Sequence, residues 1–177
     1  MTSGGPGPGD SVRIVLLMGV SGCGKSTIGA RLSRCLGWPF RDADSFHPAA
    51  NVDKMSRGQP LTDEDRWPWL DAIGTWMDDQ RRHGCSAIVS CSALKRVYRQ
   101  RLFDGRPQVR LVYLQGSKSL IADRMQGRRN HFMPPALLDS QFAALEEPAR
   151  DERALVVNIA MIPKRVVDTI VGGLRLD

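Results

Sequence analysis

The chain has 177 residues, of which 42% are hydrophobic and 25% are charged, and this composition is typical of a soluble globular protein of one domain. No apolar run approaches the ~20 residues that a membrane span needs, and residues 1–10 lack the basic and apolar regions of a signal peptide. The net charge of +6 raises the option of nucleic-acid binding, but no basic run exceeds two residues and no aromatic platform accompanies them. We therefore expect a cytoplasmic protein that binds neither membrane nor nucleic acid and has a basic pocket for small anions.

The four cysteines, Cys23, Cys35, Cys85 and Cys91, show no C-x-x-C spacing. The sequence therefore predicts reduced thiols, with neither a zinc site nor a disulfide framework, and places Cys91 in the core. Residues 1–10 are rich in glycine and proline and are predicted to form a disordered tail. Residues 11–177 are predicted to form a single domain.

The first predicted element is an apolar strand over residues 12–18, followed directly by a phosphate-binding pattern. The residues Gly19-Val20-Ser21-Gly22-Cys23-Gly24-Lys25-Ser26 fit G-x-x-x-x-G-K-[ST], and Thr27 comes next. In this pattern the backbone N–H groups surround the phosphates, the lysine reaches the β- and γ-phosphates, and the serine hydroxyl binds Mg²⁺. Apolar residues at helical spacing follow, so the loop has the strand and the helix that the pattern requires.

The remaining elements alternate between strands and helices. Strands are expected at residues 40–42, 87–91, 109–114 and 154–158. Helices are expected at residues 51–55, 62–82, 95–103, 117–128 and 135–145, and from Pro163 onward, with Thr62 and Ser117 as N-caps. This order predicts an α/β fold of the P-loop kinase type, in which a mainly parallel five-stranded sheet carries helices on both faces. Ligands bind at the carboxyl ends of the strands in such sheets.

Asp42 and Asp44 follow the second strand. Phosphoryl transfer needs Mg²⁺ near the phosphates and a carboxylate that orients the attacking hydroxyl. We expect Asp42 to serve the metal, together with Ser26, and Asp44 to accept the hydroxyl proton. The alternative is that both acids only end the strand and cap a turn.

Ser92 and Lys95 follow the third strand and are candidates for binding a polar, anionic acceptor. The alternative is that Ser92 caps the next helix and Lys95 is exposed to solvent. Arg66, with Lys54 and His47 upstream, is a further candidate, because an arginine fork suits a carboxylate. An ion pair of Arg66 with Asp63 or Asp65 is the alternative, and His47 has the weakest claim.

A basic segment contains Arg124, Arg128 and His131. The two arginines are four residues apart, so on a helix they repel each other unless an anion lies between them. We expect a mobile lid over about residues 124–135 that closes on the transferring phosphoryl group. The alternative is a solvated helix face.

Several further blocks, in order, resemble the small P-loop gluconokinases. They are D-A-D-S-F-H-P from Asp42, N-V-D-K-M from Asn51 through R-W-P-W-L, C-S-A-L-K ending at Lys95 with Tyr98-Arg99, R-N-H-F-M, and Q-F-A-A-L-E-E-P from Gln141. The resemblance extends from about residue 14 to 170. It implies ATP-dependent phosphorylation of D-gluconate at its 6-hydroxyl, with Mg²⁺, a cytosolic setting and a homodimer.

By position, the resemblance assigns residues 19–26 to ATP. It places the following side chains around gluconate or the phosphoryl group: Asp44, Lys54, Arg66, Ser92, Lys95, Arg128 and His131. Two positions depart from the expected pattern. Ala43 stands where we expect glycine, and Asn158-Ile159-Ala160 stand where acids are expected, by the adenine.

Three other classes of protein are alternatives. A shikimate-like or nucleotide kinase has the same D-x-D, but a shikimate-type enzyme is expected to have a glycine-rich turn where this chain has C-S-A-L-K. A nucleotide-dependent switch needs a D-x-x-G after a strand, and Asp104-Gly105 does not meet that requirement. Nucleic-acid binding predicts steeply salt-dependent retention on DNA.

Overall fold

Five parallel strands form the centre of the molecule in this computed structural model, which describes residues 12–127 and 135–176. The strands are β1 (Ile14–Met18), β2 (Phe40–Asp42), β3 (Ala87–Ser90), β4 (Val109–Gln115) and β5 (Leu155–Asn158). Their order across the sheet is β2-β3-β1-β4-β5, and every neighbouring pair is parallel. The predicted α/β sheet is confirmed, and it is parallel throughout rather than mainly so.

Seven α-helices in the described residues connect and cover the strands. They are α1 (Lys25–Leu36), α2 (Ala49–Ser56), α3 (Asp63–Arg82), α4 (Arg96–Phe103), α5 (Lys118–Gln126), α6 (Pro135–Ala144) and α7 (Pro163–Leu174). Two short 3₁₀ helices, η1 (Ala43–Phe46) and η2 (Arg150–Glu152), were not expected. The predicted helices are confirmed to within a few residues at each end.

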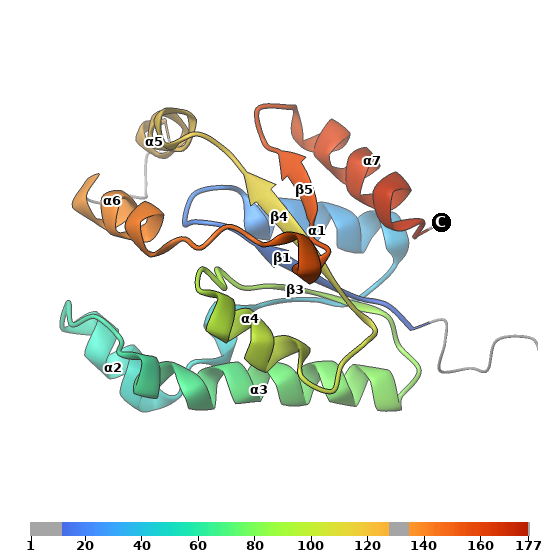
Figure 1. Cartoon of the computed structure of the whole chain (residues 1–177), viewed down its shortest axis with the longest axis horizontal. Coiled ribbons are helices and arrows are strands. Elements are labelled where there is room, and N and C mark those ends of the chain that lie inside the picture. The colour runs from blue at the N-terminus through green and yellow to red at the C-terminus, as the bar shows by residue number, and fades with distance from the viewer. Residues whose placement is uncertain (1–11, 128–134, 177) are drawn as a thin grey trace, which may run out of the picture.

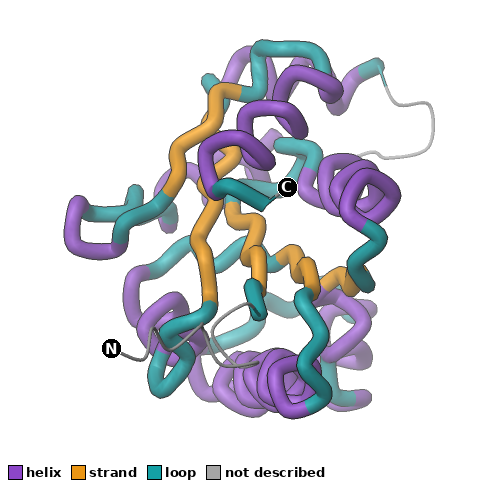
Figure 2. The backbone as a smooth tube through the Cα atoms, turned by 90° about the vertical axis from the view of Figure 1, so that its right-hand side faces the viewer, coloured by secondary structure: helices purple, strands orange, loops and turns teal. Residues whose placement is uncertain are grey.

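Helices lie on both faces of the sheet (Figures 1 and 2). Successive residues of β1 point to opposite faces, as in any strand. Ile14, Leu16 and Met18 pack with the buried residues of α3 and α4, whereas Val15 and Leu17 pack with those of α1 and α7. All five β1 side chains are fully buried, which explains why this strand reads as an unbroken apolar run.

The two predicted caps are present. The Thr62 hydroxyl accepts from the Asp65 N–H at 3.3 Å and the Asp65 carboxylate accepts from the Thr62 N–H at 2.8 Å, which completes a capping box. The Ser117 hydroxyl accepts from the Leu120 N–H at 3.2 Å. These bonds satisfy N–H groups that a helix leaves free in its first turn.

All four cysteines are free thiols, as expected. Cys23 and Cys91 are buried, and Cys35 and Cys85 are exposed. None of the helices in the described ranges has the length and apolar character needed to cross a bilayer.

Candidate active site

The loop between β1 and α1 has the conformation that its glycines predict. Gly22 and Gly24 have φ of 83° and 100°, which residues with side chains rarely adopt. Gly24 is the N-cap residue of α1, so the free N–H groups of the helix face the loop. Lys25 Nζ donates to the carbonyl oxygens of Gly19 at 2.9 Å and Val20 at 3.1 Å. These two bonds hold the Lys25 side chain across the loop that is expected to bind phosphate.

Asp42 links the end of β2 to the start of α1. Its Oδ2 accepts from the Ser26 hydroxyl at 2.6 Å, and its Oδ1 accepts from the Asp44 N–H at 3.0 Å. Asp42 caps η1, as the alternative interpretation predicts, and it also contacts the phosphate loop through Ser26. The Asp44 carboxylate has no hydrogen-bond partner in the described part of the chain.

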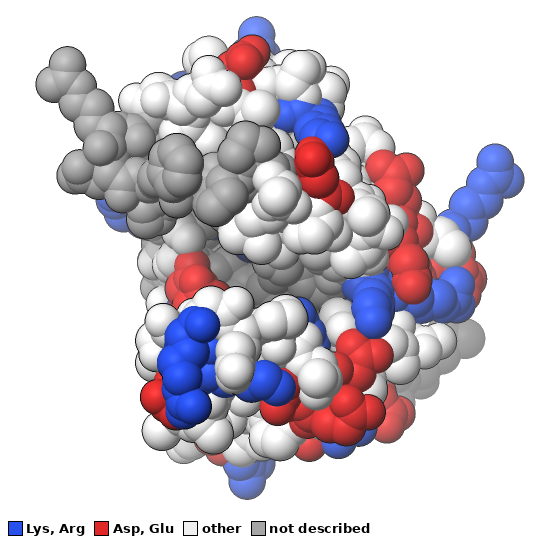
Figure 3. All heavy atoms as spheres, turned by 90° about the vertical axis from the view of Figure 1, so that its left-hand side faces the viewer, with Lys and Arg blue, Asp and Glu red and all other residues white. Residues whose placement is uncertain are grey.

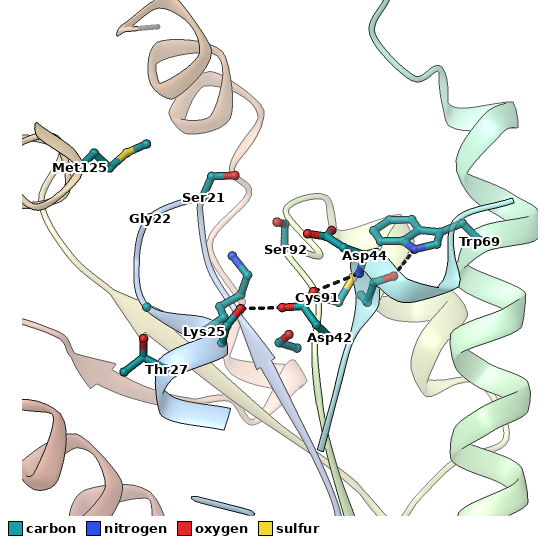
Figure 4. A pocket seen from close by; sticks show the side chains of 14 residues that line it. Ser21, Gly22, Lys25, Thr27, Asp42, Asp44, Trp69, Cys91, Ser92 and Met125 are labelled. Atoms are coloured by element: carbon teal, nitrogen blue, oxygen red, sulfur yellow. Dashed lines mark hydrogen bonds between the residues drawn. The ribbon is translucent and has the colours of Figure 1, made fainter. Parts of the chain in front are cut away.

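A cavity of about 300 Å³ opens between the phosphate loop and the ends of β2 and β3 (Figure 4). Its lining includes Lys25, Ser26, Asp42, Asp44, Ser92 and Trp69. The structure thus brings together candidates from three segments that are far apart in sequence. They meet because the carboxyl ends of parallel strands lie at one edge of the sheet.

A second cavity of about 240 Å³ lies on the other side of the loop. Its lining combines loop residues 22–24 with Ile28, Arg124, Ile159, Met161 and Val166, and it is mostly apolar. Arg124 Nη2 donates to the Ile159 carbonyl oxygen at 2.5 Å. Ile159 therefore lies close to the loop, in the same cavity as residues 22–24.

Lys54 and Lys95 both pair with aspartates at the start of α3. Lys54 Nζ lies 2.5 Å from Asp65 Oδ2, and Lys95 Nζ lies 3.1 Å from Asp63 Oδ1. Asp63 also accepts from the Tyr98 hydroxyl, and this bond, followed by that of Lys95, lowers the pKa of Asp63. The bond from Lys54 lowers the pKa of Asp65. Both aspartates are therefore ionised at neutral pH.

The ion pair that was the alternative for Arg66 is absent from the described part of the chain. There Asp65 pairs with Lys54 and Asp63 pairs with Lys95, and neither pairs with Arg66. Arg66 Nη2 donates to the Leu61 carbonyl oxygen at 3.4 Å, and its buried Nε has no partner among the described residues. The guanidinium thus retains unused hydrogen-bond donors.

His47 stacks on Trp69, with ring centroids 4.4 Å apart and an interplanar angle of 10°. Burial lowers the pKa of His47, and nearby Arg66 adds to this effect while Asp44 opposes it. The imidazole is therefore neutral at pH 7. Its Nδ1 lies 3.5 Å from Asn51 Nδ2, which also donates to the Asp65 carbonyl oxygen at 2.9 Å.

The alternative in which Ser92 caps a helix is wrong. The N-cap residue of α4 is Lys95, and it makes no side-chain cap bond. Ser92 lines the first cavity instead, and its carbonyl oxygen accepts from the Gly19 N–H at 3.3 Å. Arg128 and His131, and with them most of the expected lid, lie outside the described residues.

Two contacts were not indicated by the sequence pattern. Trp69 Nε1 donates to the Ala43 carbonyl oxygen at 2.8 Å, so this buried side chain of α3 also fixes the turn between the two acids. Gln141 Oε1 accepts from the Ser21 N–H at 3.1 Å and lies 3.4 Å from its hydroxyl. Gln141 belongs to one of the blocks that resemble gluconokinases, and this is the only signal that points to it.

The face onto which the strands' carboxyl ends open is hollowed between two halves (Figure 3). Basic and acidic side chains lie close together on the half below the hollow. This mixture agrees with the Lys54–Asp65 and Lys95–Asp63 pairs.

Comparison with known proteins identifies the family. Residues 14–148 match the AAA domain family. The chain is 43% identical to a gluconokinase of Gluconobacter oxydans over 165 residues, which cover 93% of each protein. It is 47% identical to the thermosensitive gluconokinase of Escherichia coli over 141 residues, covering 80% of this chain and 75% of the relative. The chain belongs to the gluconokinase family.

A solved structure agrees with this gluconokinase assignment. The crystal structure of a gluconokinase from Sinorhizobium meliloti superposes with a TM-score of 0.83 at 43% identity, over 92% of this chain and 91% of that one. Membership in the gluconokinase family makes the chain a P-loop, nucleotide-binding kinase. The predicted resemblance and fold class are therefore confirmed.

Proposed function

We propose that this chain transfers the γ-phosphoryl group of ATP to the 6-hydroxyl of D-gluconate, giving 6-phosphogluconate and ADP. The observation that carries the proposal is the cavity that Lys25, Ser26 and Asp42 share with Asp44 and Ser92. It joins a phosphate-binding loop to a carboxylate without a partner among the described residues. The gluconokinase relatives favour gluconate over the acceptors of shikimate-like or nucleotide kinases.

ATP would lie across the two cavities. Residues 19–27 would bind the phosphates, with Lys25 exchanging its bonds to two loop carbonyls for bonds to phosphate oxygens. The adenine would occupy the apolar cavity beside Ile159, where Arg124 lies. Because the expected acids are absent at residues 158–160, the base would be held mainly by apolar contact.

The residues beside the loop fit a magnesium ion. The Ser26 hydroxyl and the Asp42 carboxylate are hard oxygen donors, 2.6 Å apart. Within the described ranges no three His, Cys, Asp or Glu side chains are grouped to hold a metal, so ATP would supply further ligands, as is usual for Mg²⁺. When bound, the ion would offset the negative charge that develops on the phosphates.

Asp44 is the proposed base. Both Asp42 oxygens already accept hydrogen bonds, whereas those of Asp44 accept none from the described residues. As the acceptor oxygen attacks the γ-phosphorus of ATP, Asp44 takes the hydroxyl proton. The bond from this phosphorus to the β,γ-bridging oxygen breaks, and the oxygen leaves as part of ADP. A positioned base of this kind is worth about 10²–10⁴ in rate.

The acceptor would lie between Asp44 and the start of α3. Arg66 offers its unused donors to the gluconate carboxylate, and neutral His47 and Ser92 are suited to its hydroxyls. Lys54 and Lys95 would contribute positive charge from their aspartate pairs. Arg128 and His131 are proposed to close over the phosphoryl group, in a homodimeric, cytoplasmic enzyme with a single kinase domain.

A coupled assay of ADP release tests the function. The panel contains gluconate, idonate, glycerate, shikimate and nucleoside monophosphates, with ATP and Mg²⁺. We expect gluconate to give a kcat/KM at least about tenfold above every other acceptor, equivalent to about 1.4 kcal/mol of discrimination. A silent gluconate reaction with turnover of another acceptor would refute the substrate assignment and leave the kinase chemistry standing.

Two variants test the assigned roles. Lys25→Ala should nearly abolish turnover of a folded protein, whereas Lys164→Ala, which removes an exposed α7 lysine, should not change it. Asp44→Asn should lower kcat by about 100-fold, with little change in the KM for ATP. An effect of Asp44→Asn confined to ATP affinity would exclude Asp44 as the base.

A further inference from the structure

Arg99 is a charged side chain in the interior, on α4, and is 0% exposed. Its Nε and Nη2 donate to the two carboxylate oxygens of Glu152, at 2.5 and 2.9 Å. Glu152 belongs to η2, 53 positions away in sequence, and its side chain is 8% exposed. The hydrogen bond from Arg99 lowers the pKa of Glu152, so the pair is ionised at neutral pH.

The remaining nitrogen of the guanidinium binds the segment between β3 and α4. Arg99 Nη1 donates to the carbonyl oxygens of Ala93 at 3.0 Å and Leu94 at 3.1 Å. Ala93 has a φ of 44°, in the left-handed region that residues with side chains seldom occupy. The buried arginine therefore binds the carbonyl group of Ala93, the residue of this segment whose backbone has the uncommon left-handed conformation.

Other bonds fix the same segment from the outside. The Ser92 carbonyl oxygen accepts from the Gly19 N–H at 3.3 Å, and the Leu94 carbonyl oxygen also accepts from the Glu146 N–H at 2.8 Å. Three successive carbonyl groups are thus bound by three different parts of the chain. This segment carries Ser92, which lines the cavity, and leads into Lys95, which pairs with Asp63.

A buried ion pair is weak evidence for stability, because apolar side chains of similar volume often serve as well. An apolar side chain could not bind the carbonyl groups of residues 93 and 94. The contacts therefore indicate a role in geometry. Arg101, an exposed arginine of the same helix, pairs with Asp71 of α3 in equally good bidentate geometry, at 2.7 and 2.8 Å, and has no hydrogen bond to this segment among the described residues.

We propose that Arg99, held by Glu152, is a positioning residue that fixes the segment from Ser92 to Lys95 and thereby sets the affinity for the acceptor, without contacting either substrate. The inference rests on the proposed acceptor role of Ser92. It concerns the acceptor side, because the bonds of Arg99 end on Ala93, Leu94 and Glu152, and Arg99 is not among the described residues that line the apolar cavity.

Steady-state kinetics of Arg99→Lys, Glu152→Gln and the control Arg101→Lys test the proposal. KM is suited to this test because it does not depend on how much of the protein is folded, so a purely structural role would change only the apparent kcat. We expect Arg99→Lys to raise the KM for gluconate at least tenfold, with a KM for ATP within about twofold of wild type. Arg101→Lys should leave both constants unchanged.

Glu152→Gln keeps the size of the side chain and one acceptor oxygen, so it gives a second measurement if Arg99→Lys does not fold. It should raise the KM for gluconate by a smaller factor. Unchanged KM values in folded variants, or equal increases for gluconate and ATP, would overturn the inference. A wild-type protein that does not phosphorylate gluconate would instead refute the proposed function, so the two failures are distinguishable.

Discussion

Replacing Trp69 with phenylalanine tests how the turn between the two acids is held. The indole Nε1 donates to the Ala43 carbonyl oxygen at 2.8 Å, and Ala43, which lies between Asp42 and Asp44, is 1% exposed. Phenylalanine retains a ring that can stack on His47 but removes this donor. We therefore expect the turn to loosen while the helix around it stays intact.

The magnitude follows from the burial of the carbonyl group. A buried acceptor left without its partner costs about 1–3 kcal/mol. A loss of about 2 kcal/mol, with a urea dependence of about 2 kcal/mol per molar, lowers the unfolding midpoint by about 1 M. Because both acids depend on this turn, we also expect kcat with gluconate to fall by about tenfold, or about 1.4 kcal/mol in activation free energy.

Trp76→Phe is the matched control in the same helix. Trp76 packs edge-to-face on Phe46, with centroids 6.0 Å apart, and its indole N–H has no hydrogen-bond partner among the described residues. We expect Trp76→Phe to lower the urea unfolding midpoint by less than half as much as Trp69→Phe does, and to leave kcat unchanged. Urea unfolding followed by circular dichroism, together with the coupled assay, gives both quantities. Equal midpoints and equal kcat for the two variants would refute the reasoning.

Two further predictions concern Gly29 and His47. A methyl group added at Gly29 would come within 2.3 Å of the Phe40 ring, whereas one at Gly172 meets nothing within 4 Å. Gly29→Ala should therefore lower Tm, since overpacking costs about 1–3 kcal/mol, and Gly172→Ala should raise it, since helical alanine gains about 1 kcal/mol over glycine; equal shifts would contradict the packing argument. Burial lowers the pKa of His47 below its usual 6.5, so the unfolded chain binds the proton more readily. The stability that neutral His47 provides is complete above pH 6.5 and is lost as pH falls through its folded-state pKa. Urea midpoints at pH 7.5 and 5.5 should thus differ less in His47→Gln than in wild type, and the same difference in both would exclude His47 as the source.

Much of the fold can be predicted from the sequence because its signals are local. The β1 apolar run, the glycines of the loop and the Thr62 capping box each act within a few residues of the chain, and the structure contains all three. The location of the first cavity also follows from the topology, because parallel strands bring Asp42 and Ser92 to the same end of the sheet. These parts need no knowledge of distant contacts.

The unpredicted part consists of pairings between distant segments. Gln141 reaches Ser21 across 120 positions, and no periodicity encodes which amide meets the loop. The sequence pattern does not distinguish Arg99 from the surface arginines, because its partner Glu152 lies 53 positions away in the chain. For Arg66, the sequence shows that Asp63 and Asp65 are near in the chain, but it does not show that they pair with Lys95 and Lys54.

The positions of the four thiols have a practical consequence. Cys35 lies in the last turn of α1, before β2, and Cys85 lies two residues before β3. Both exposed thiols are therefore near the amino ends of strands, at the edge of the sheet opposite the cavity. Near the loop, burial raises the pKa of Cys23 and raises that of Cys91 to about 12, so neither forms the reactive thiolate readily. A maleimide dye or surface tether would therefore react with Cys35 and Cys85 of the unaltered chain, at the edge of the sheet opposite the cavity. The wild-type protein can therefore be labelled or immobilised through Cys35 and Cys85 for single-molecule measurements of catalysis.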